Sequence, residues 1–191
     1  MGPVPKALKR FIWDLSSLID MADGDEREIV TVGKDLMARL LAEPDWLPDD
    51  FAQARPGTPC HFQIYEDPQE RFFIFSELWA PGQAGAAIDH GGWGFLGVLA
   101  GDEARQRFSP QGASLGIKTW AAGSVEVVSR RTGLTTQSAN ASLITQSANA
   151  SALAPLIGIR VFGGDHPYRR TKANRIERPG WDIYTIGEAA E

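Results

Sequence analysis

Few side chains in this sequence carry an imidazole or a thiol, the groups that titrate nearest to neutral pH and also ligate transition metals. The 191 residues include three histidines, His61, His90 and His166, and one cysteine, Cys60. A single cysteine excludes an intrachain disulfide, a Cys-x-x-Cys redox site and a cysteine-rich zinc site. Cys60 stands beside His61, but adjacent strand residues point to opposite faces, so we predict a buried apolar cysteine rather than a nucleophile. His166 is predicted to lie exposed in a loop, with contact to a ligand at a pocket rim as the alternative.

Two amphipathic helices are expected ahead of these groups. Apolar residues recur at helical spacing over Lys6–Ala22 and again over Arg27–Glu43. Asp25 is suited to cap the start of the second helix, and Pro44 ends it. Residues 1–55 are therefore predicted to form a helical hairpin packed on the rest of the chain.

From residue 56 onward the apolar period changes to that of strands. The twenty glycines and twelve prolines of the chain indicate many turns and short strands. Candidate strands are His61–Tyr65, Arg71–Trp79, Gly94–Leu99, Leu115–Ala121, Val125–Ser129, Leu156–Phe162 and Asp182–Ile186. Glu103 is placed in a turn region between two of them. This pattern predicts an all-β sandwich or barrel over residues 56–191.

One heptapeptide, Thr-Gln-Ser-Ala-Asn-Ala-Ser, occurs twice, at residues 136–142 and 145–151. Two copies are too few for a solenoid. The small, polar composition favours a loop insertion at residues 134–153. A lid over a pocket is the alternative.

The stretch Trp79–Leu99 reads WAPGQAGAAIDHGGWGFLGVL. Its Trp-x-Pro-Gly-Gln and Trp-Gly-x-x-Gly-Val-Leu pieces, with Trp46-Leu47-Pro48 upstream, resemble the bacterial thiol dioxygenases. These are the cysteine dioxygenase and 3-mercaptopropionate dioxygenase family of cupins, and the resemblance runs to about Gly164. It implies an all-β cupin double-stranded β-helix, or jelly-roll barrel, with an N-terminal α-helical hairpin and a small internal pocket.

The resemblance also implies an iron site, which this sequence has altered. In the family, three histidines hold Fe(II), and two of them come from a His-x-His motif. Here Ile88 stands at the first position of that motif, His90 keeps the second, and Glu126 occupies the position of the third histidine. Ile88 cannot ligate a metal, so two ligands are left, fewer than a ferrous site needs. The Ser-x-His-x-Tyr relay of the family reads Gly-Ile-Arg-Val-Phe over residues 158–162.

Strand alternation offers a third ligand. Gln63 matches a glutamine of the mercaptopropionate subgroup, and if it points into the barrel, His61 and Tyr65 do so as well. His61, His90 and Glu126 would then form a two-histidine, one-carboxylate site. A thiol dioxygenase with Fe(II) and these unusual ligands is therefore one alternative.

The same alignment places Glu126 and Arg160 inside the barrel, where either charge alone is costly to bury. One expectation is an ion pair between them in place of the iron. The functional expectation uses the same groups: Arg160 binds a substrate carboxylate, Glu126 acts as a base with a raised pKa, and His90 relays a proton. The substrate-binding residues expected around these catalytic groups are His61, Gln63, Ile88, Trp93 and Phe162.

We therefore predict a metal-independent acid–base enzyme of the isomerase, lyase or cyclase type, acting on a small carboxylate-containing molecule without a cofactor. A non-catalytic cupin that binds a small molecule is the other alternative. The net charge of −5 argues against nucleic acid or an anionic membrane as a partner. A cytoplasmic monomer or homodimer is expected, because no apolar run is long enough to span a membrane and no signal peptide is evident.

Overall fold

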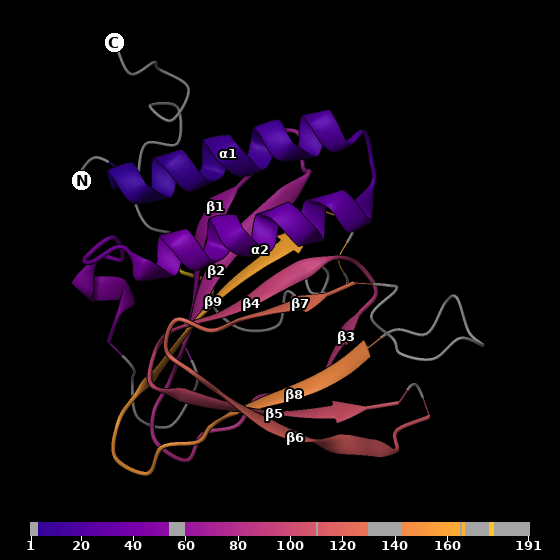
Figure 1. Cartoon of the computed structure of the whole chain (residues 1–191). Coiled ribbons are helices and arrows are strands. Elements are labelled where there is room, and N and C mark those ends of the chain that lie inside the picture. The colour runs from indigo at the N-terminus through magenta and orange to yellow at the C-terminus, as the bar shows by residue number, and fades with distance from the viewer. Residues whose placement is uncertain are drawn as a thin grey trace.

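The computed structural model describes residues 4–53, 60–109, 111–129, 143–164, 166 and 176–177. Two helices lie over one face of a pair of β-sheets (Figure 1). The helices are α1 (Lys6–Ala22), α2 (Glu26–Ala42) and a 3-10 turn at Asp49–Phe51. The strands are β1 (Cys60–Glu66), β2 (Phe72–Trp79), β3 (Ile88–His90), β4 (Gly94–Ala100), β5 (Asp102–Phe108), β6 (Ser114–Ala121), β7 (Val125–Val128), β8 (Leu143–Asn149), β9 (Leu156–Gly163) and β10 (Ile176–Glu177).

The two helices form the predicted hairpin. The carboxylate of Asp25 accepts a hydrogen bond from the backbone N–H of Arg27 at 2.9 Å and so caps α2. Gly24 has a positive φ of 85°, which lets the chain turn between the helices. Within the described residues, no helix is long and apolar enough to cross a membrane.

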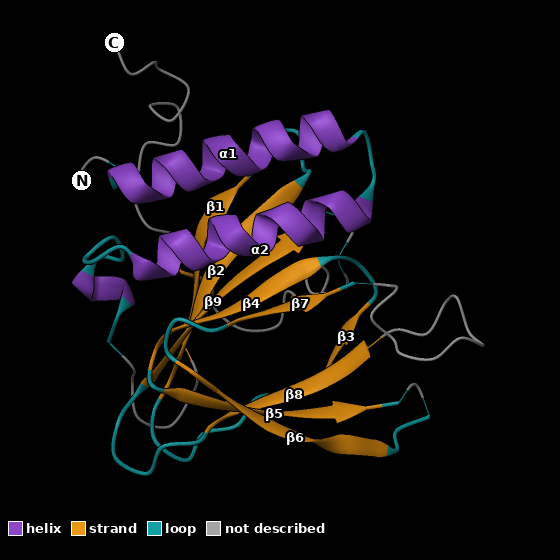
Figure 2. Cartoon of the chain, in the orientation of Figure 1, coloured by secondary structure: helices purple, strands orange, loops and turns teal. Residues whose placement is uncertain are grey.

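The strands form two mainly antiparallel sheets that face each other (Figure 2). Six strands follow the order β10-β1-β2-β9-β4-β7, and four follow the order β3-β8-β5-β6. Between β2 and β9 the chain passes repeatedly from one sheet to the other, which is the interleaving of a jelly roll. The predicted double-stranded β-helix, or jelly-roll barrel, with an N-terminal helical hairpin is therefore confirmed.

The helices cover the outer face of the six-stranded sheet, and most of the apolar core lies between these two layers. A Cβ placed on Gly33 of α2 would lie 2.4 Å from the ring of Phe95 on β4, so this glycine allows close packing. Both β2 and β9 are buried along their whole length. One face of each strand packs against the helices, and the other lines the barrel interior.

Besides the two-residue strand β10, which was not predicted, three strands were missed or misjudged from the sequence. Strands β3 and β5 were not predicted, and Glu103 is not in a turn but within β5, fully buried. The predicted loop insertion at residues 134–153 is wrong over Leu143–Asn149, which forms β8. These segments lack the apolar alternation used to find strands, because the barrel face that they line is polar and charged. The predicted strand Asp182–Ile186 lies outside the described residues.

Strand alternation also failed in β1. The pairing of β1 with β2 shifts register between Gln63 and Tyr65, which marks a β-bulge. Tyr65 therefore packs into the core beneath the helices instead of pointing into the barrel. There burial raises its pKa to about 12, and the nearby carboxylate of Asp67 adds to the effect.

The sequence that forms β8 is preceded in the chain by a nearly identical tandem copy. Residues 134–142 (LTTQSANAS) differ from residues 143–151 (LITQSANAS) at one position, where Thr135 replaces Ile144. We expect deletion of residues 134–142 to leave cooperative unfolding intact, because the four remaining residues 130–133 reach about 17 Å. Facing sheets lie only about 10 Å apart.

Deletion of residues 143–151 gives the matched control, because that chain differs from the first deletion only by threonine in place of Ile144. Ile144 is half-buried on the outer face of the four-stranded sheet. Thermal unfolding of both variants should be a single transition, with the second variant less stable by about 1 kcal/mol or less. Loss of cooperative unfolding in both variants would contradict the expectation.

Candidate functional site

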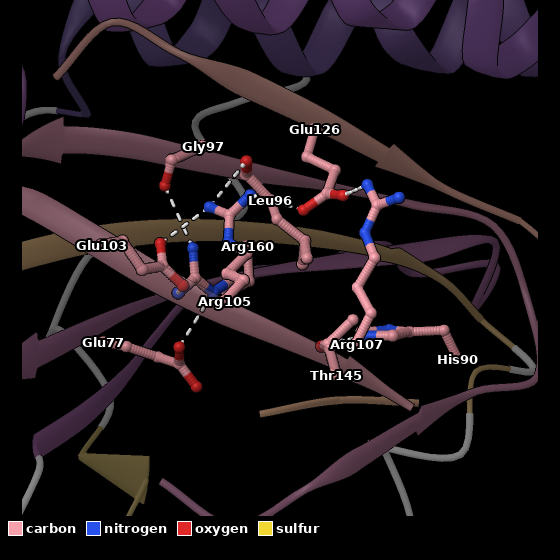
Figure 3. Close-up of polar contacts among 10 residues, drawn as sticks. All are labelled: Glu77, His90, Leu96, Gly97, Glu103, Arg105, Arg107, Glu126, Thr145 and Arg160. Atoms are coloured by element: carbon pink, nitrogen blue, oxygen red, sulfur yellow. Dashed lines mark hydrogen bonds and ion pairs between the residues drawn. The ribbon is translucent and has the colours of Figure 1, made fainter. Parts of the chain in front are cut away.

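The barrel interior contains a continuous chain of alternating charges (Figure 3). Its members come from both sheets, and each is bonded to the next. In order they are His61, Glu77, Arg160, Glu103, Arg105, Glu126 and Arg107. Three carboxylates and three guanidinium groups balance in charge, which is what allows so many ionised groups to be buried together.

Arg160 on β9 is the centre of one half of this chain. Its Nε donates to Glu77 at 2.8 Å and its Nη2 donates to Glu103 at 2.7 Å. Its Nη1 donates to the backbone carbonyl of Gly97 at 3.1 Å. Burial acts to lower the pKa of Arg160, but the two carboxylates outweigh it and raise that pKa. Burial likewise acts to raise the pKa of Glu77, but Arg160 and His61 hold it at about 2.

Glu126 on β7 is the centre of the other half. Its Oε2 accepts from Arg105 at 2.9 Å, and its Oε1 accepts from Arg107. Arg105 also donates to Glu103 at 2.7 Å and to the carbonyl of Leu96 at 3.1 Å, which links the two halves. The expected ion pair between Glu126 and Arg160 is therefore wrong: each pairs with other residues, because β5 places Glu103 and Arg105 between them.

Strand β5 supplies three of these charges through simple alternation. Glu103, Arg105 and Arg107 are two residues apart, so all three side chains point into the barrel. Arg105 is almost fully buried, whereas 35% of the Arg107 side chain is exposed. Sequence reasoning missed both arginines. Their alternation with Ala104 and Gln106 was the available signal.

A second polar group lies where β3 and β8 meet. The Nε2 of His90 lies 2.8 Å from the hydroxyl oxygen of Thr145, and its Nδ1 lies 3.1 Å from the Nε2 of His166. All three residues are buried, so the predicted exposed loop position of His166 is wrong. The ring of His166 stacks on Phe162 with the centroids 3.8 Å apart and the planes 7° apart, which holds it in the interior.

Both imidazoles in this group are neutral at physiological pH. Burial lowers the pKa of His166 to about 3. Burial also lowers the pKa of His90 well below its ordinary value, and His166 and the arginines Arg160 and Arg105 add to that effect. Two neutral arrangements of protons satisfy both contacts of His90. In one, the Thr145 hydroxyl donates to Nε2 and Nδ1–H donates to His166. In the other, Nε2–H donates to Thr145 and Nδ1 accepts from His166.

The other predicted site residues are not all in the interior. His61 faces Glu77 with 3.5 Å between Nδ1 and Oε1, and Gln63 donates to Glu66 at 2.9 Å. Ile88 is half-buried and lies opposite Thr145 in the sheet. Trp93 is not part of an interior wall, because it packs in the core beneath the helices.

Phe162 and Cys60 complete the predicted set. Phe162 lies in a separate interior cluster with aromatic and aliphatic neighbours and contacts the His90 ring at 5.6 Å between centroids. Cys60 is half-buried and packs against the helical core. The interior wall is therefore built around Phe162, while the thiol lies on the other face of β1 from His61.

The residues present do not fit a ferrous ion. The described part of the chain holds no group of three His, Cys, Asp or Glu side chains placed to bind a metal. Both oxygens of Glu126 are bound by guanidinium groups, and both ring nitrogens of His90 have partners. A divalent cation at Glu126 would also have to displace Arg107 and approach a second arginine, which is electrostatically unfavourable.

No protein family model matches the chain. One similar solved structure is an uncharacterised conserved protein with a double-stranded β-helix domain from Klebsiella pneumoniae, at 14% identity over 64% of this chain and 90% of that chain, with a TM-score of 0.47. A cupin superfamily protein from Desulfitobacterium hafniense matches at 14% identity over 63% and 92%, with a TM-score of 0.45. Oxalate decarboxylase from Bacillus subtilis matches at 15% identity over 48% and 21%, with a TM-score of 0.37. The likeness concerns the fold alone.

Proposed function

We propose that this cupin is an enzyme that binds a small carboxylate-bearing molecule and moves a proton on it without a metal ion. The observation that supports the proposal is the position of Arg107. Among the arginines of the charge chain, Arg107 has a partly exposed side chain, and it lies opposite Thr145 of the histidine group in the β5–β8 pairing. A cation for the substrate and a base for its proton are thus adjacent.

The roles of the arginines differ from the sequence expectation. Arg160 was expected to bind the substrate carboxylate, but all three of its donor nitrogens have partners and only 3% of the side chain is exposed. Arg107 donates from one nitrogen, Nη2, to one oxygen of Glu126. Its remaining N–H groups can therefore bind a substrate carboxylate. Arg107 is therefore the anchor in the proposed mechanism.

His90 is the proposed acid–base group. In its neutral form the imidazole can accept a proton from a carbon next to a carbonyl and return it to another atom of the substrate. A substrate carboxylate beside Arg107 adds negative charge near the ring, which raises the pKa of His90 towards neutrality when the substrate is bound. Isomerisation and elimination both follow from this one proton transfer.

Glu126 has a supporting part in this mechanism. Its two oxygens hold Arg105 and Arg107, so it positions the anchor and does not act as a free base in this arrangement. A substrate carboxylate bound to the remaining N–H groups of Arg107 leaves the bond from Arg107 to Glu126 in place. Replacement of Glu126 by Gln should therefore weaken substrate binding as well as turnover.

The test is deuterium exchange on small 2-oxo acids, starting with pyruvate and 2-oxobutyrate, in D2O with proton NMR detection. We expect the wild type to catalyse loss of the carbon-bound proton signals. His90→Gln should lower that rate at least about 100-fold, and Arg107→Met should weaken binding by about 10- to 100-fold, the contribution of a charge-assisted hydrogen bond. Arg10→Met, which changes an exposed surface arginine, is the control. Unchanged exchange in His90→Gln would overturn the proposal.

A non-catalytic binding cupin is the second candidate. The half of the interior around Arg160 is fully paired within the protein and fills space that a substrate would otherwise occupy. This candidate predicts saturable carboxylate binding that Arg107→Met weakens, with no proton exchange in the wild type.

A further inference from the structure

We propose that Thr145 is a nucleophile and that this site transfers or hydrolyses acyl groups that end in a carboxylate. The inference rests on the proposed function in one respect, the use of Arg107 as the carboxylate anchor. Beyond the proposed function, it assigns a covalent step, and it assigns that step to Thr145, which the acid–base proposal does not use. The substrates it names are esters and thioesters of small dicarboxylic acids.

Three side chains have the geometry of an activated nucleophile. A hydroxyl is a weak nucleophile unless a base lies within about 2.6–3.2 Å and a third group orients that base. Thr145 and His90 are 2.8 Å apart, and His90 and His166 are 3.1 Å apart. His166 is itself fixed by stacking on Phe162. The order hydroxyl, imidazole, imidazole therefore corresponds to nucleophile, base and orienting group.

One of the two neutral tautomers of His90 has the hydrogen-bond direction that catalysis requires. In that tautomer the Thr145 hydroxyl donates to Nε2 of His90, and the Nδ1–H of His90 donates to His166. We assign this tautomer to the reactive state, because it aims the lone pair of His90 at the hydroxyl proton. When His90 becomes protonated, its Nδ1–H still has an acceptor in His166, so the imidazolium is held in place.

Arg107 and Ile88 flank the nucleophile on the interior face. Each is the direct cross-strand partner of Thr145, Arg107 on β5 and Ile88 on β3. In Figure 3 the Arg107 side chain runs from Thr145 towards Glu126. Thr145 itself is buried, so a substrate reaches it from the side of Arg107, which is 35% exposed. A carboxylate bound to the remaining N–H groups of Arg107 fixes the acyl chain beside the hydroxyl.

The covalent step balances without a cofactor. The Oγ of Thr145 bonds to the acyl carbon as its proton passes to the Nε2 of His90, and the negative charge on the carbonyl oxygen forms close to the Arg107 guanidinium. The bond to the alcohol or thiol then breaks, and His90 gives that leaving group its proton. Water attacks the acyl-threonine with His90 again as the base, which releases the acid and restores the Thr145 hydroxyl.

The experiment uses the full chain with two probes, 4-nitrophenyl acetate and the mono-4-nitrophenyl ester of adipic acid. We expect nitrophenolate release and, after acid quench and peptide mass spectrometry, one acyl group on Thr145. Thr145→Ser should keep the label, because it keeps a hydroxyl. Thr145→Val, which keeps the shape of the side chain, should lower labelling at least about 100-fold. Thr119→Val, at an exposed threonine of β6, should match the wild type.

Arg107 and His166 each have a separate readout. Arg107→Met should slow acylation by both esters and remove the preference for the adipate ester over the acetate ester, while any label that forms stays on Thr145. His166→Phe keeps the ring stacked on Phe162 but removes the acceptor for His90, so it should slow acylation and shift its pH profile. His166 is thus tested as a positioning residue.

Two outcomes would overturn the inference: no acyl group on Thr145 in the wild type, or equal labelling in a folded Thr145→Val variant. Either result leaves the proposed function standing if wild-type proton exchange on 2-oxo acids persists and depends on His90. Acylation of Thr145 without any proton exchange would instead support this inference and contradict the acid–base proposal. The two proposals therefore fail on different measurements.

Discussion

We expect Arg160→Met to lower the free energy of unfolding by about 3–5 kcal/mol, the cost of leaving buried charges without their partner. Arg160 is bonded to both Glu77 and Glu103, and all three side chains are almost fully buried. Methionine fills much of the volume of arginine, so the loss comes from the two carboxylates rather than from a cavity. Urea unfolding of wild type and variant at pH 7 gives the difference.

The control is Arg10→Met, which removes a surface ion pair with Asp14 in α1. Both side chains of this pair are exposed, Arg10 by 77% and Asp14 by 41%. Such pairs contribute about 0.5 kcal/mol or less. A double variant, Glu77→Gln with Arg160→Met, should recover part of the lost free energy of unfolding, because it removes one of the two buried carboxylates that have lost their partner. A loss in Arg160→Met no larger than in the control would show that the interior network does not stabilise the barrel.

We also expect stability to fall in mildly acidic solution because of the buried histidines. Burial lowers the pKa of His166 from an ordinary 6.5 to about 3 and lowers the pKa of His90 in the same direction. Well above pH 6.5 the two rings are neutral in both the native and the unfolded state, so the free energy of unfolding does not change with pH on their account. Below pH 6.5 the rings become protonated in the unfolded chain but stay neutral in the native barrel. For one histidine the free energy of unfolding falls by about 1.4 kcal/mol by pH 5.5.

The measurement is the free energy of unfolding at pH 7.5, 6.5 and 5.5 for wild type and His166→Gln. The variant should lose less stability across this range, because one of the two titrating rings is gone. The depressed pKa values of Glu77 and Glu103 act in a different window, since their contribution is lost only below about pH 4.5. Parallel pH dependence in wild type and variant would show that His166 is not held neutral in the native state.

The sequence predicted the architecture well because burial against the helices leaves a periodic apolar signal. The helical hairpin was found from its apolar stripe. Strands β2, β4 and β9 were found because at least one face of each packs in the core. Strands β5 and β8 were not found, because the inward face of each strand carries charged or small polar residues. In a sequence, such residues indicate a segment exposed to solvent.

The sequence predicted the interior position of three residues of the candidate site, but not their partners. Glu126, His90 and Arg160 do lie buried in the barrel. Their partners, Arg105, Arg107, Thr145 and His166, were missed or placed elsewhere. His166 follows a glycine pair in a turn, and only its stacking on Phe162 and its contact with His90 show that it is an interior residue.

By itself, the sequence determined which faces of the chain are apolar, and through them the helical hairpin and the barrel. It also determined that position 88 carries isoleucine, whose side chain cannot ligate a metal. Only the tertiary structure decided which buried charges pair, because an ion pair depends on atoms a few ångströms apart on strands remote in the chain. Arg160 and Glu77 are 83 positions apart, yet their nitrogen and oxygen lie at 2.8 Å. No local pattern encodes that distance, so the chemistry of the interior follows from the fold.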